Sequence, residues 1–128
     1  MSGVLLKEER RNFSRIALSR PATLEAGGAR FACELLDISM RGALFRVKGQ
    51  LQVIDEQPCT VVVHLDAGSA AIRMKGAVAH QADRTVGVRC REIDFESITH
   101  LRRLLELNLG DEKLLHRELA ALVAERGS

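Results

Sequence analysis

The feature that most constrains the fold is a run of short, strand-like segments between Arg20 and Glu92, separated from one another by turn residues. In one segment Phe31, Cys33 and Leu35 fall on the same face of an extended chain, because successive side chains of a strand point to opposite sides. The Ala-Gly-Gly sequence at Ala26–Gly28 is typical of the tight turn that would precede this segment. Several short strands at regular spacing predict an antiparallel β-barrel.

Four further segments continue the pattern. In the first of them Ala43, Phe45 and Val47 alternate with other residues, and the second is rich in β-branched residues, as buried strands are. The last two are predicted to form a hairpin with its turn near Gln81–Arg84. The four segments are GALFRV, CTVVVHL, AIRMKGAVAH and TVGVRCRE.

After Ile93 the apolar residues change to helical spacing. A first helix is predicted in DFESITHLRRLLELNLG, with Asp94 or Ser97 as its N-cap and Gly110 as the left-handed residue that ends it. A second helix is predicted to open at Asp111, and we expect the two helices to cover the open end or the side of the barrel. The apolar residues behind this prediction are Ile98, Leu101, Leu104, Leu105 and Leu109, and then Leu115, Leu119 and Leu122.

The length of 128 residues predicts one small domain, and a hydrophobic content of 46% excludes a disordered chain. The cysteines Cys33, Cys59 and Cys90 include no C-x-x-C pair, which favours free, buried thiols over a disulfide framework or a zinc site. No apolar run approaches the roughly 20 residues that span a bilayer, and the start does not have the pattern of a signal peptide. We therefore expect a cytoplasmic protein with no membrane span and no metal site.

The charge of the chain is unevenly distributed. The formal net charge is only +2, which argues against a dedicated binder of duplex DNA, since such proteins present a broad basic face. Residues 1–50 contain nine Lys or Arg against five Asp or Glu, hence +4, and the other residues contain ten against twelve, hence −2. The first part of the chain is therefore where a compact anion would be attracted.

Two segments in this basic part stand out. Three arginines surround one phenylalanine in RRNFSR, residues 10–15, which has no helical or strand periodicity. The second segment, DISMRG, lies between two predicted strands. Taken separately, the first is a solvated tail. The second is then a tight connection in which Asp37 and Ser39 bond nearby backbone N–H groups and Gly42 supplies a positive φ.

Taken together, the two segments resemble the paired signature of the PilZ domain, a family of bacterial receptors for cyclic di-GMP. The sequence R-x-x-x-R is present at Arg11 and Arg15, and D-x-S-x-x-G is present at Asp37, Ser39 and Gly42. The likeness extends over nearly the whole chain and is strongest to the small standalone PilZ proteins.

This resemblance implies a mainly β fold: an antiparallel six-stranded PilZ-type β-barrel with C-terminal α-helices. The implied divisions are a flexible arm at residues 1–19, the barrel at residues 20–93, and helices packed on the barrel at residues 94–126. The implied function is that of a cyclic di-GMP receptor that changes conformation on binding and relays the signal to a downstream protein partner. The sequence leaves open whether the chain is a monomer or a weak homodimer.

The resemblance also implies how the motif residues bind. An arginine side chain presents a planar fork that matches phosphate oxygens and the acceptor pair on the Hoogsteen edge of guanine. A carboxylate accepts from the N–H donors of guanine, and glycine lets the backbone approach the ligand closely. The residues implied to bind are Arg10, Arg11 and Arg15 as the clamp, and Asp37, Ser39 and Gly42 as the floor of the site.

Each of two further positions has two alternative roles that the sequence does not decide between. Arg41, inside the second motif, either adds a phosphate contact or points to solvent. His80 ends a predicted strand where some relatives place an aromatic residue that stacks on guanine, and the alternative is an exposed strand end. In the family, an arginine at the position of Arg10 favours a stacked pair of ligand molecules.

Enzymatic activity is not expected, because the sequence shows no nucleophile–base pair, metal cluster, phosphate-binding loop or paired carboxylates. Two other functions remain as alternatives. One is a PilZ-like protein-protein adaptor that binds no nucleotide. The other is a small β-barrel that binds single-stranded nucleic acid with its basic arm, although aromatic residues make up only 3% of the chain.

Overall fold

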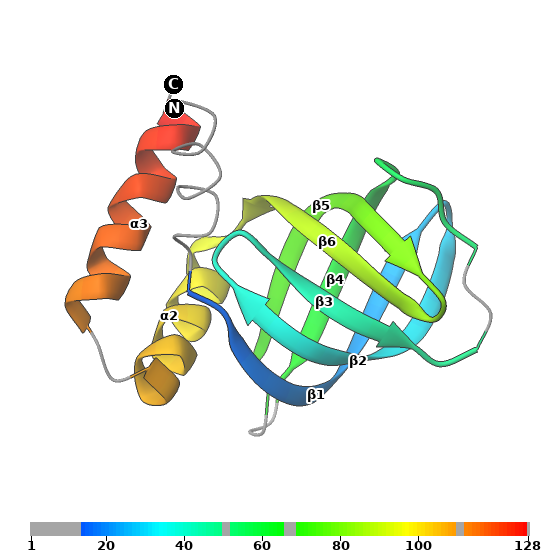
Figure 1. Ribbon diagram of the computed structural model, residues 1–128, viewed down its shortest axis with the longest axis horizontal. Coiled ribbons are helices and arrows are strands. Elements are labelled where there is room, and N and C mark those ends of the chain that lie inside the picture. Colours follow the sequence, from blue (N-terminus) through cyan, green and yellow to red (C-terminus); the bar gives the residue numbers. More distant parts are fainter. Residues whose placement is uncertain (1–13, 50–51, 66–68, 110–111, 128) are drawn as a thin grey trace.

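The computed structural model describes residues 14–49, 52–65, 69–109 and 112–127 (Figure 1). Arg10 and Arg11 therefore lie outside the described residues, and so do Gly110 and Asp111, which were predicted to end the first helix and open the second. The elements in chain order are β1 (Ile16–Ala26), β2 (Ala29–Ser39), β3 (Gly42–Val47), β4 (Pro58–His64), β5 (Ala71–Ala82), β6 (Thr85–Ile93), α2 (Phe95–Leu109) and α3 (Glu112–Gly127).

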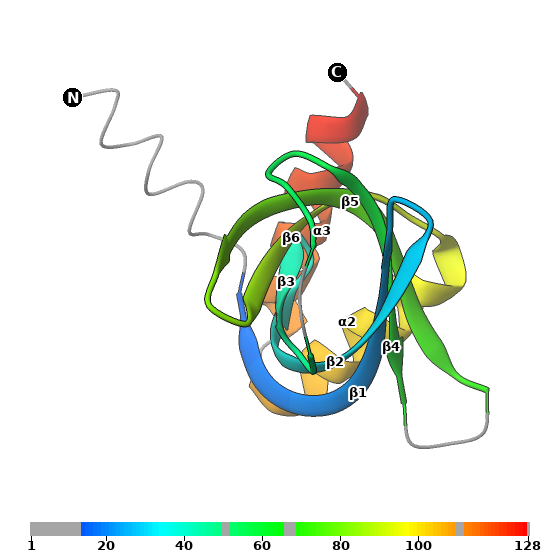
Figure 2. The same ribbon diagram turned by 90° about the vertical axis from the view of Figure 1, so that its right-hand side faces the viewer.

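The six strands form a closed barrel in the order β1-β2-β3-β6-β5-β4, and every neighbouring pair is antiparallel. Figure 2 looks along the barrel and shows the strands as a ring. The prediction of a mainly β, six-stranded antiparallel barrel followed by helices is confirmed. Closure leaves no strand edge unpaired, which suits a small barrel without a second sheet.

The predicted turns are found between the strands. Gly27 and Gly28 connect β1 to β2 with φ values of 60° and 80°, and a two-residue turn of type I′ needs positive φ at both central positions. Asp83 and Arg84 connect β5 to β6, within the predicted turn. Asp83 takes a positive φ of 55°, which aspartate tolerates better than most residues.

The first strand begins earlier than the predicted start of the barrel at residue 20. Ile16 is buried and pairs with Ile38 of β2, and Ala17 pairs with Asp37. The register shifts between Ala17 and Arg20, so an irregularity divides β1 into two paired parts. More and less exposed residues alternate along the whole of β1, but the polar Arg20 falls on the more buried face and Pro21 follows it, so the apolar pattern in the sequence did not reveal the earlier start.

The interior of the barrel is almost entirely aliphatic. The predicted inward residues Cys33, Leu35, Phe45 and Val47 are all buried, and Phe31 is half-buried against them. The period-2 pattern of the sequence therefore identified the inner face correctly. Together with these residues the fully buried side chains include Leu24, Ile38, Met40, Val61, Ile72 and Met74.

The helices lie at one end of the barrel, with α2 against it and α3 on the far side of α2 (Figure 1). Leu101 and Leu105 of α2 are fully buried in the same core as the strands, so the prediction that helices cover an open end is confirmed. Leu122 of α3 also reaches this core. Neither of the two helices, as far as their residues are described, is long and apolar enough to cross a membrane.

Asp94, one of the two predicted caps, starts α2. Its carboxylate accepts a hydrogen bond from the Ser97 N–H at 2.6 Å, and this bond holds the pKa of Asp94 below its ordinary value. Ser97 lies inside the helix instead, where its buried hydroxyl oxygen accepts from the Arg73 N–H at 2.9 Å. The cap and the serine together attach the first turn of α2 to β5.

The three cysteines are free and buried, as the sequence predicted. Burial raises the pKa of the Cys33 and Cys59 thiols from 9.0 to about 11. These thiols are protonated at neutral pH, so they act as small apolar residues of the core.

Candidate functional site

The segment Asp37–Gly42 forms the β2–β3 hairpin. Ser39 pairs with Gly42, so Met40 and Arg41 make a two-residue loop, in which Met40 is fully buried. The Ser39 hydroxyl oxygen is buried and accepts a hydrogen bond from the Arg41 N–H at 3.1 Å. The serine thus fixes the backbone of the loop that carries Arg41.

Gly42 is required for a reason that the sequence did not reveal. Its φ is not among the positive values, so the reading in which it supplies a positive φ is wrong. A Cβ built on Gly42 would lie 2.1 Å from the carbonyl oxygen of Val88, on the neighbouring strand β6. Close approach of two strand backbones, not turn geometry, explains the glycine.

Arg15 and Asp37 form an ion pair across the start of β1. Nη1 of Arg15 lies 2.7 Å from Oδ1 of Asp37, and the Arg15 side chain is 52% exposed whereas that of Asp37 is 22% exposed. Residues that are 22 positions apart in the chain meet because Ala17 pairs with Asp37 in the sheet. The second arginine of R-x-x-x-R and the aspartate of the other motif are thereby brought into contact.

His80 projects from β5 across β6. It pairs with Gly87, and a Cβ on that glycine would lie 2.3 Å from Cε1 of the histidine ring. The missing side chain of Gly87 is therefore the space that the ring occupies. His80 is exposed, and its imidazole presents an aromatic surface to the outside of the barrel.

A hollow of about 270 Å³ joins these features on the outer surface of the barrel. Four sequence-predicted residues line it: Arg15, Arg41, Gly42 and His80. Asp37 belongs to the site through its ion pair with Arg15, and Ser39 lies buried beneath the hairpin loop. The other lining residues are Ala43, Leu44, Ala79, Gly87, Val88 and Arg89.

Arg89 is a member of this site that the sequence reasoning missed. It lies on β6 directly opposite Gly42, and its Nη2 is 2.6 Å from Oε1 of Glu56. The available signal was the alternation in TVGVRCRE, where Val86, Val88 and Cys90 are buried and the intervening residues must face outward. Only the pairing of β6 with β3 shows that this outward face adjoins the second motif.

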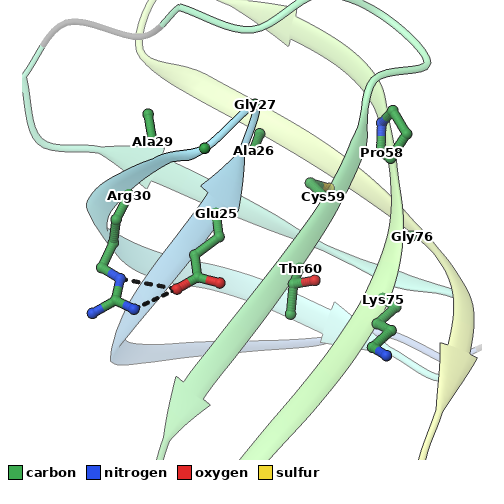
Figure 3. A pocket seen from close by; sticks show the side chains of 11 residues that line it. Glu25, Ala26, Gly27, Ala29, Arg30, Pro58, Cys59, Thr60, Lys75 and Gly76 are labelled. Atoms are coloured by element: carbon green, nitrogen blue, oxygen red, sulfur yellow. Dashed lines mark hydrogen bonds and ion pairs between the residues drawn. The ribbon is translucent and has the colours of Figure 1, made fainter.

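A larger hollow, of about 500 Å³, lies elsewhere, around the β1–β2 turn (Figure 3). Arg30 donates two hydrogen bonds to Glu25 there, at 2.9 and 2.6 Å, and Lys75 of β5 lies on the opposite side. None of the motif residues that the structure describes lines it. Volume alone would select this hollow, whereas the convergence of motif residues selects the smaller one.

The described part of the N-terminal segment is also attached to α3. Ser14 donates to Oε2 of Glu118 through its backbone N–H, at 2.9 Å, and through its hydroxyl, at 2.5 Å. Glu118 is 4% exposed, and its other oxygen, Oε1, is buried with no hydrogen-bond partner among the residues that the structure describes. The residue before Arg15 is therefore held by a buried carboxylate of the last helix.

Comparison with known proteins identifies the family and the fold. A family model described as PilZ domain matches residues 9–107, a range that includes both motifs and the whole barrel. Among solved structures, the fold is similar to the crystal structure of the PilZ domain of CeSA from a cellulose synthesizing bacterium. That match has a TM-score of 0.59 and 15% sequence identity, and it covers 77% of this chain and 99% of the other.

The fold is also similar to that of the Bacillus subtilis inhibitor of motility, MotI/DgrA, with a TM-score of 0.65 and 14% identity. This match covers 80% of the present chain and 52% of MotI/DgrA, so the chain spans about half the length of that protein. At these identities the two structures establish the likeness of fold.

Proposed function

The chain belongs to the PilZ domain family, and from this premise we propose that it is a receptor for cyclic di-GMP that relays binding to a downstream protein partner. The observation that carries the proposal is the convergence of Arg15, Arg41, Gly42 and His80 on one hollow, with Asp37 paired to Arg15 at its rim. In this proposal the protein binds and carries out no chemistry.

The charges of the site suit the ligand. Cyclic di-GMP carries two phosphodiester charges and two guanines on one small ring. Guanidinium groups match both the phosphate oxygens and the Hoogsteen acceptors of guanine, and the Asp37 carboxylate matches the guanine N–H donors. The Arg15–Asp37 pair holds both side chains near their binding positions before the ligand arrives, which lowers the ordering cost of binding.

The size of the hollow fits a site that the arm completes. Its volume of about 270 Å³ is just below the roughly 300–1,000 Å³ of most ligand pockets. The first arginines of the motif, Arg10 and Arg11, are outside the described residues, and we propose that they close over the ligand from the solvent side. Arg10 favours the version of this proposal in which two stacked ligand molecules bind.

The proposed relay has a physical route through Ser14. This residue precedes Arg15 and is hydrogen-bonded to Glu118 of α3. If the segment around Arg15 reorders when it binds the ligand, the Ser14–Glu118 contact is strained or broken. Within the described part of the chain Oε1 of Glu118 has no hydrogen-bond partner, so loss of the Ser14 contact would leave this buried carboxylate without its hydrogen bonds. The position of α3 would then report the state of the ligand site.

Calorimetric titration tests the proposal. We expect wild-type protein to bind cyclic di-GMP at micromolar concentrations or below and to bind GTP and single-stranded oligonucleotides far more weakly. Arg11→Ala and Asp37→Ala should each weaken binding about tenfold or more, because one bidentate contact to a base contributes about 1–3 kcal/mol.

Arg30→Ala is the matched control. Arg30 is also an exposed arginine in an ion pair, with Glu25, but it lies at the other hollow, so this variant should bind like wild type. Failure of wild type to bind cyclic di-GMP would refute the receptor proposal and favour the adaptor. Preferential binding of oligonucleotides would favour the nucleic-acid binder.

A further inference from the structure

We propose that Arg89 is an additional ligand-binding arginine of this site and that Glu56 competes with the ligand for it. The inference rests on the proposed function and adds to it a residue outside both motifs. Its consequence is that Glu56 sets the affinity of the receptor: the carboxylate holds Arg89 in place in the empty site and is exchanged for a phosphate oxygen when ligand binds.

The position of Arg89 supports a direct contact. It faces Gly42 across the β3–β6 pairing and lines the same hollow as Arg15 and Arg41. Three arginines therefore line one hollow of about 270 Å³, and the carboxylate of the second motif, Asp37, is paired with one of them, Arg15. A ligand with two phosphodiester charges supplies the negative charge that such an arrangement favours.

The backbone of Glu56 is fixed by the turn that carries it. Its φ is 66°, a left-handed conformation that is unusual for glutamate, and its N–H donates to the Val78 carbonyl at 2.7 Å. The adjacent Gln57 fixes the turn further through a hydrogen bond from the Ile54 N–H at 3.0 Å. The turn therefore fixes the backbone position from which the Glu56 side chain reaches toward β6.

The contact between Glu56 and Arg89 is one that a phosphate can replace. Glu56 Oε1 lies 2.6 Å from Nη2 of Arg89, but the Glu56 side chain is 60% exposed and that of Arg89 is 38% exposed. Exposed ion pairs are weak because water solvates both partners well. The pair uses a single nitrogen of the guanidinium in this geometry, whereas a phosphate can engage two in parallel.

Arg91 provides a matched control within the same strand. It lies two residues from Arg89, and its Nη2 is 3.5 Å from the same Glu56 oxygen, so both arginine side chains reach the same side of β6. It does not line the hollow. A nonspecific effect of removing positive charge from β6 would therefore appear in both arginine variants, whereas a ligand contact would appear only at Arg89.

The test is calorimetric titration of cyclic di-GMP into wild type and into the variants Arg89→Ala, Arg91→Ala, Glu56→Gln and the double variant Glu56→Gln/Arg89→Ala. We expect Arg89→Ala to weaken binding about tenfold and Arg91→Ala to change it less than twofold. Glu56→Gln should strengthen binding severalfold, and this gain should vanish when Arg89 is absent. The loss of affinity caused by Arg89→Ala should be smaller at high salt, because screening weakens the phosphate contact in the wild-type protein.

The outcomes separate this inference from the receptor proposal. If wild type does not bind, the receptor proposal itself is refuted. If wild type binds but Arg89→Ala binds equally well, or if Glu56→Gln strengthens binding to the same extent with and without Arg89, the inference is wrong and the receptor proposal stands. Should Arg89→Ala not fold, as judged by its urea midpoint, Arg89→Lys carries the test. Lysine keeps the positive charge but lacks the planar guanidinium that can donate two parallel hydrogen bonds. The Arg89→Lys variant is therefore expected to bind at least threefold more weakly than wild type.

Discussion

Replacing Gly42 by alanine should destabilise the barrel itself, even though we propose that the motif containing Gly42 binds ligand. The new Cβ would lie 2.1 Å from the Val88 carbonyl oxygen and 3.3 Å from Cα of Arg89. Non-bonded carbon contacts are comfortable near 3.5 Å, so β3 and β6 would have to separate by roughly 1 Å. The obstacle is backbone in a closed barrel, which cannot rotate out of the way.

The matched substitution is Gly87→Ala, on the strand facing Gly42. Its Cβ would also be too close to a neighbour, 2.3 Å from Cε1 of His80, but this neighbour is an exposed side chain that can change rotamer. Overpacking a rigid interior costs about 1–3 kcal/mol, and we place Gly42→Ala in the upper half of that range. Gly87→Ala should cost less than about 1 kcal/mol, because a rotamer change relieves the clash.

Urea unfolding followed by circular dichroism measures the difference. With a slope of about 1.5–2 kcal/mol per molar urea, the unfolding midpoint should fall by roughly 1–2 M for Gly42→Ala and by less than about 0.5 M for Gly87→Ala. Equal midpoints for Gly42→Ala and wild type would refute the reasoning, since the strands would then have room for a side chain. Gly87→Ala should stay folded yet displace the His80 ring from the hollow.

Three further expectations concern the capped helix, the thiols and the Ser14 contact. Asp94→Ala should lower the free energy of unfolding by about 1 kcal/mol at neutral pH, as loss of an N-cap does. Because the folded-state pKa of Asp94 is lowered, the cap's contribution should be lost as pH falls through that pKa, so that urea midpoints of variant and wild type converge in acid. Cys33 and Cys59, whose folded pKa is about 11, should react with a disulfide reagent slowly at pH 7.5 when folded and rapidly in urea. Their contribution to stability should decline as pH rises from 9 toward 11, because the unfolded chain loses these protons first. Glu118→Ala should speed hydrogen exchange at the Ser14 amide about tenfold, because it removes the hydrogen-bond acceptor of that amide, while Glu118→Gln should retain protection. Equal exchange rates in the two variants would show that the contact does not hold the segment.

The barrel strands could be predicted from the sequence because they depend on local order. Alternation depends only on residues two positions apart in the chain, so the sequence was enough to predict that Cys33, Leu35 and Phe45 face the interior. The cap at Asp94 and the turn at Gly27–Gly28 are likewise decided within a few residues. The early start of β1 at Ile16 was missed because the polar Arg20 stands on its more buried face and interrupts the run of apolar residues.

The composition of the site could be predicted only in part, since the register of distant strands decides it. The motif residues Arg15 and Asp37 are named by the sequence, but their contact requires the pairing of β1 with β2. Arg89 carries no local signal that separates it from Arg91; the β3–β6 pairing places one of them opposite Gly42 and leaves the other outside the hollow.

By itself, then, the sequence determined which faces of the strands are buried, where the chain turns and which residues carry the family motifs. Only the tertiary structure explains why position 42 is occupied by glycine. It also places Arg89 beside the hollow with Glu56 as its ion-pair partner, and it brings Ser14 into contact with the last helix. The physical reason is that side-chain alternation and capping are short-range properties of the chain. Strand register and barrel closure arise instead from the packing of segments tens of residues apart, which no local pattern encodes.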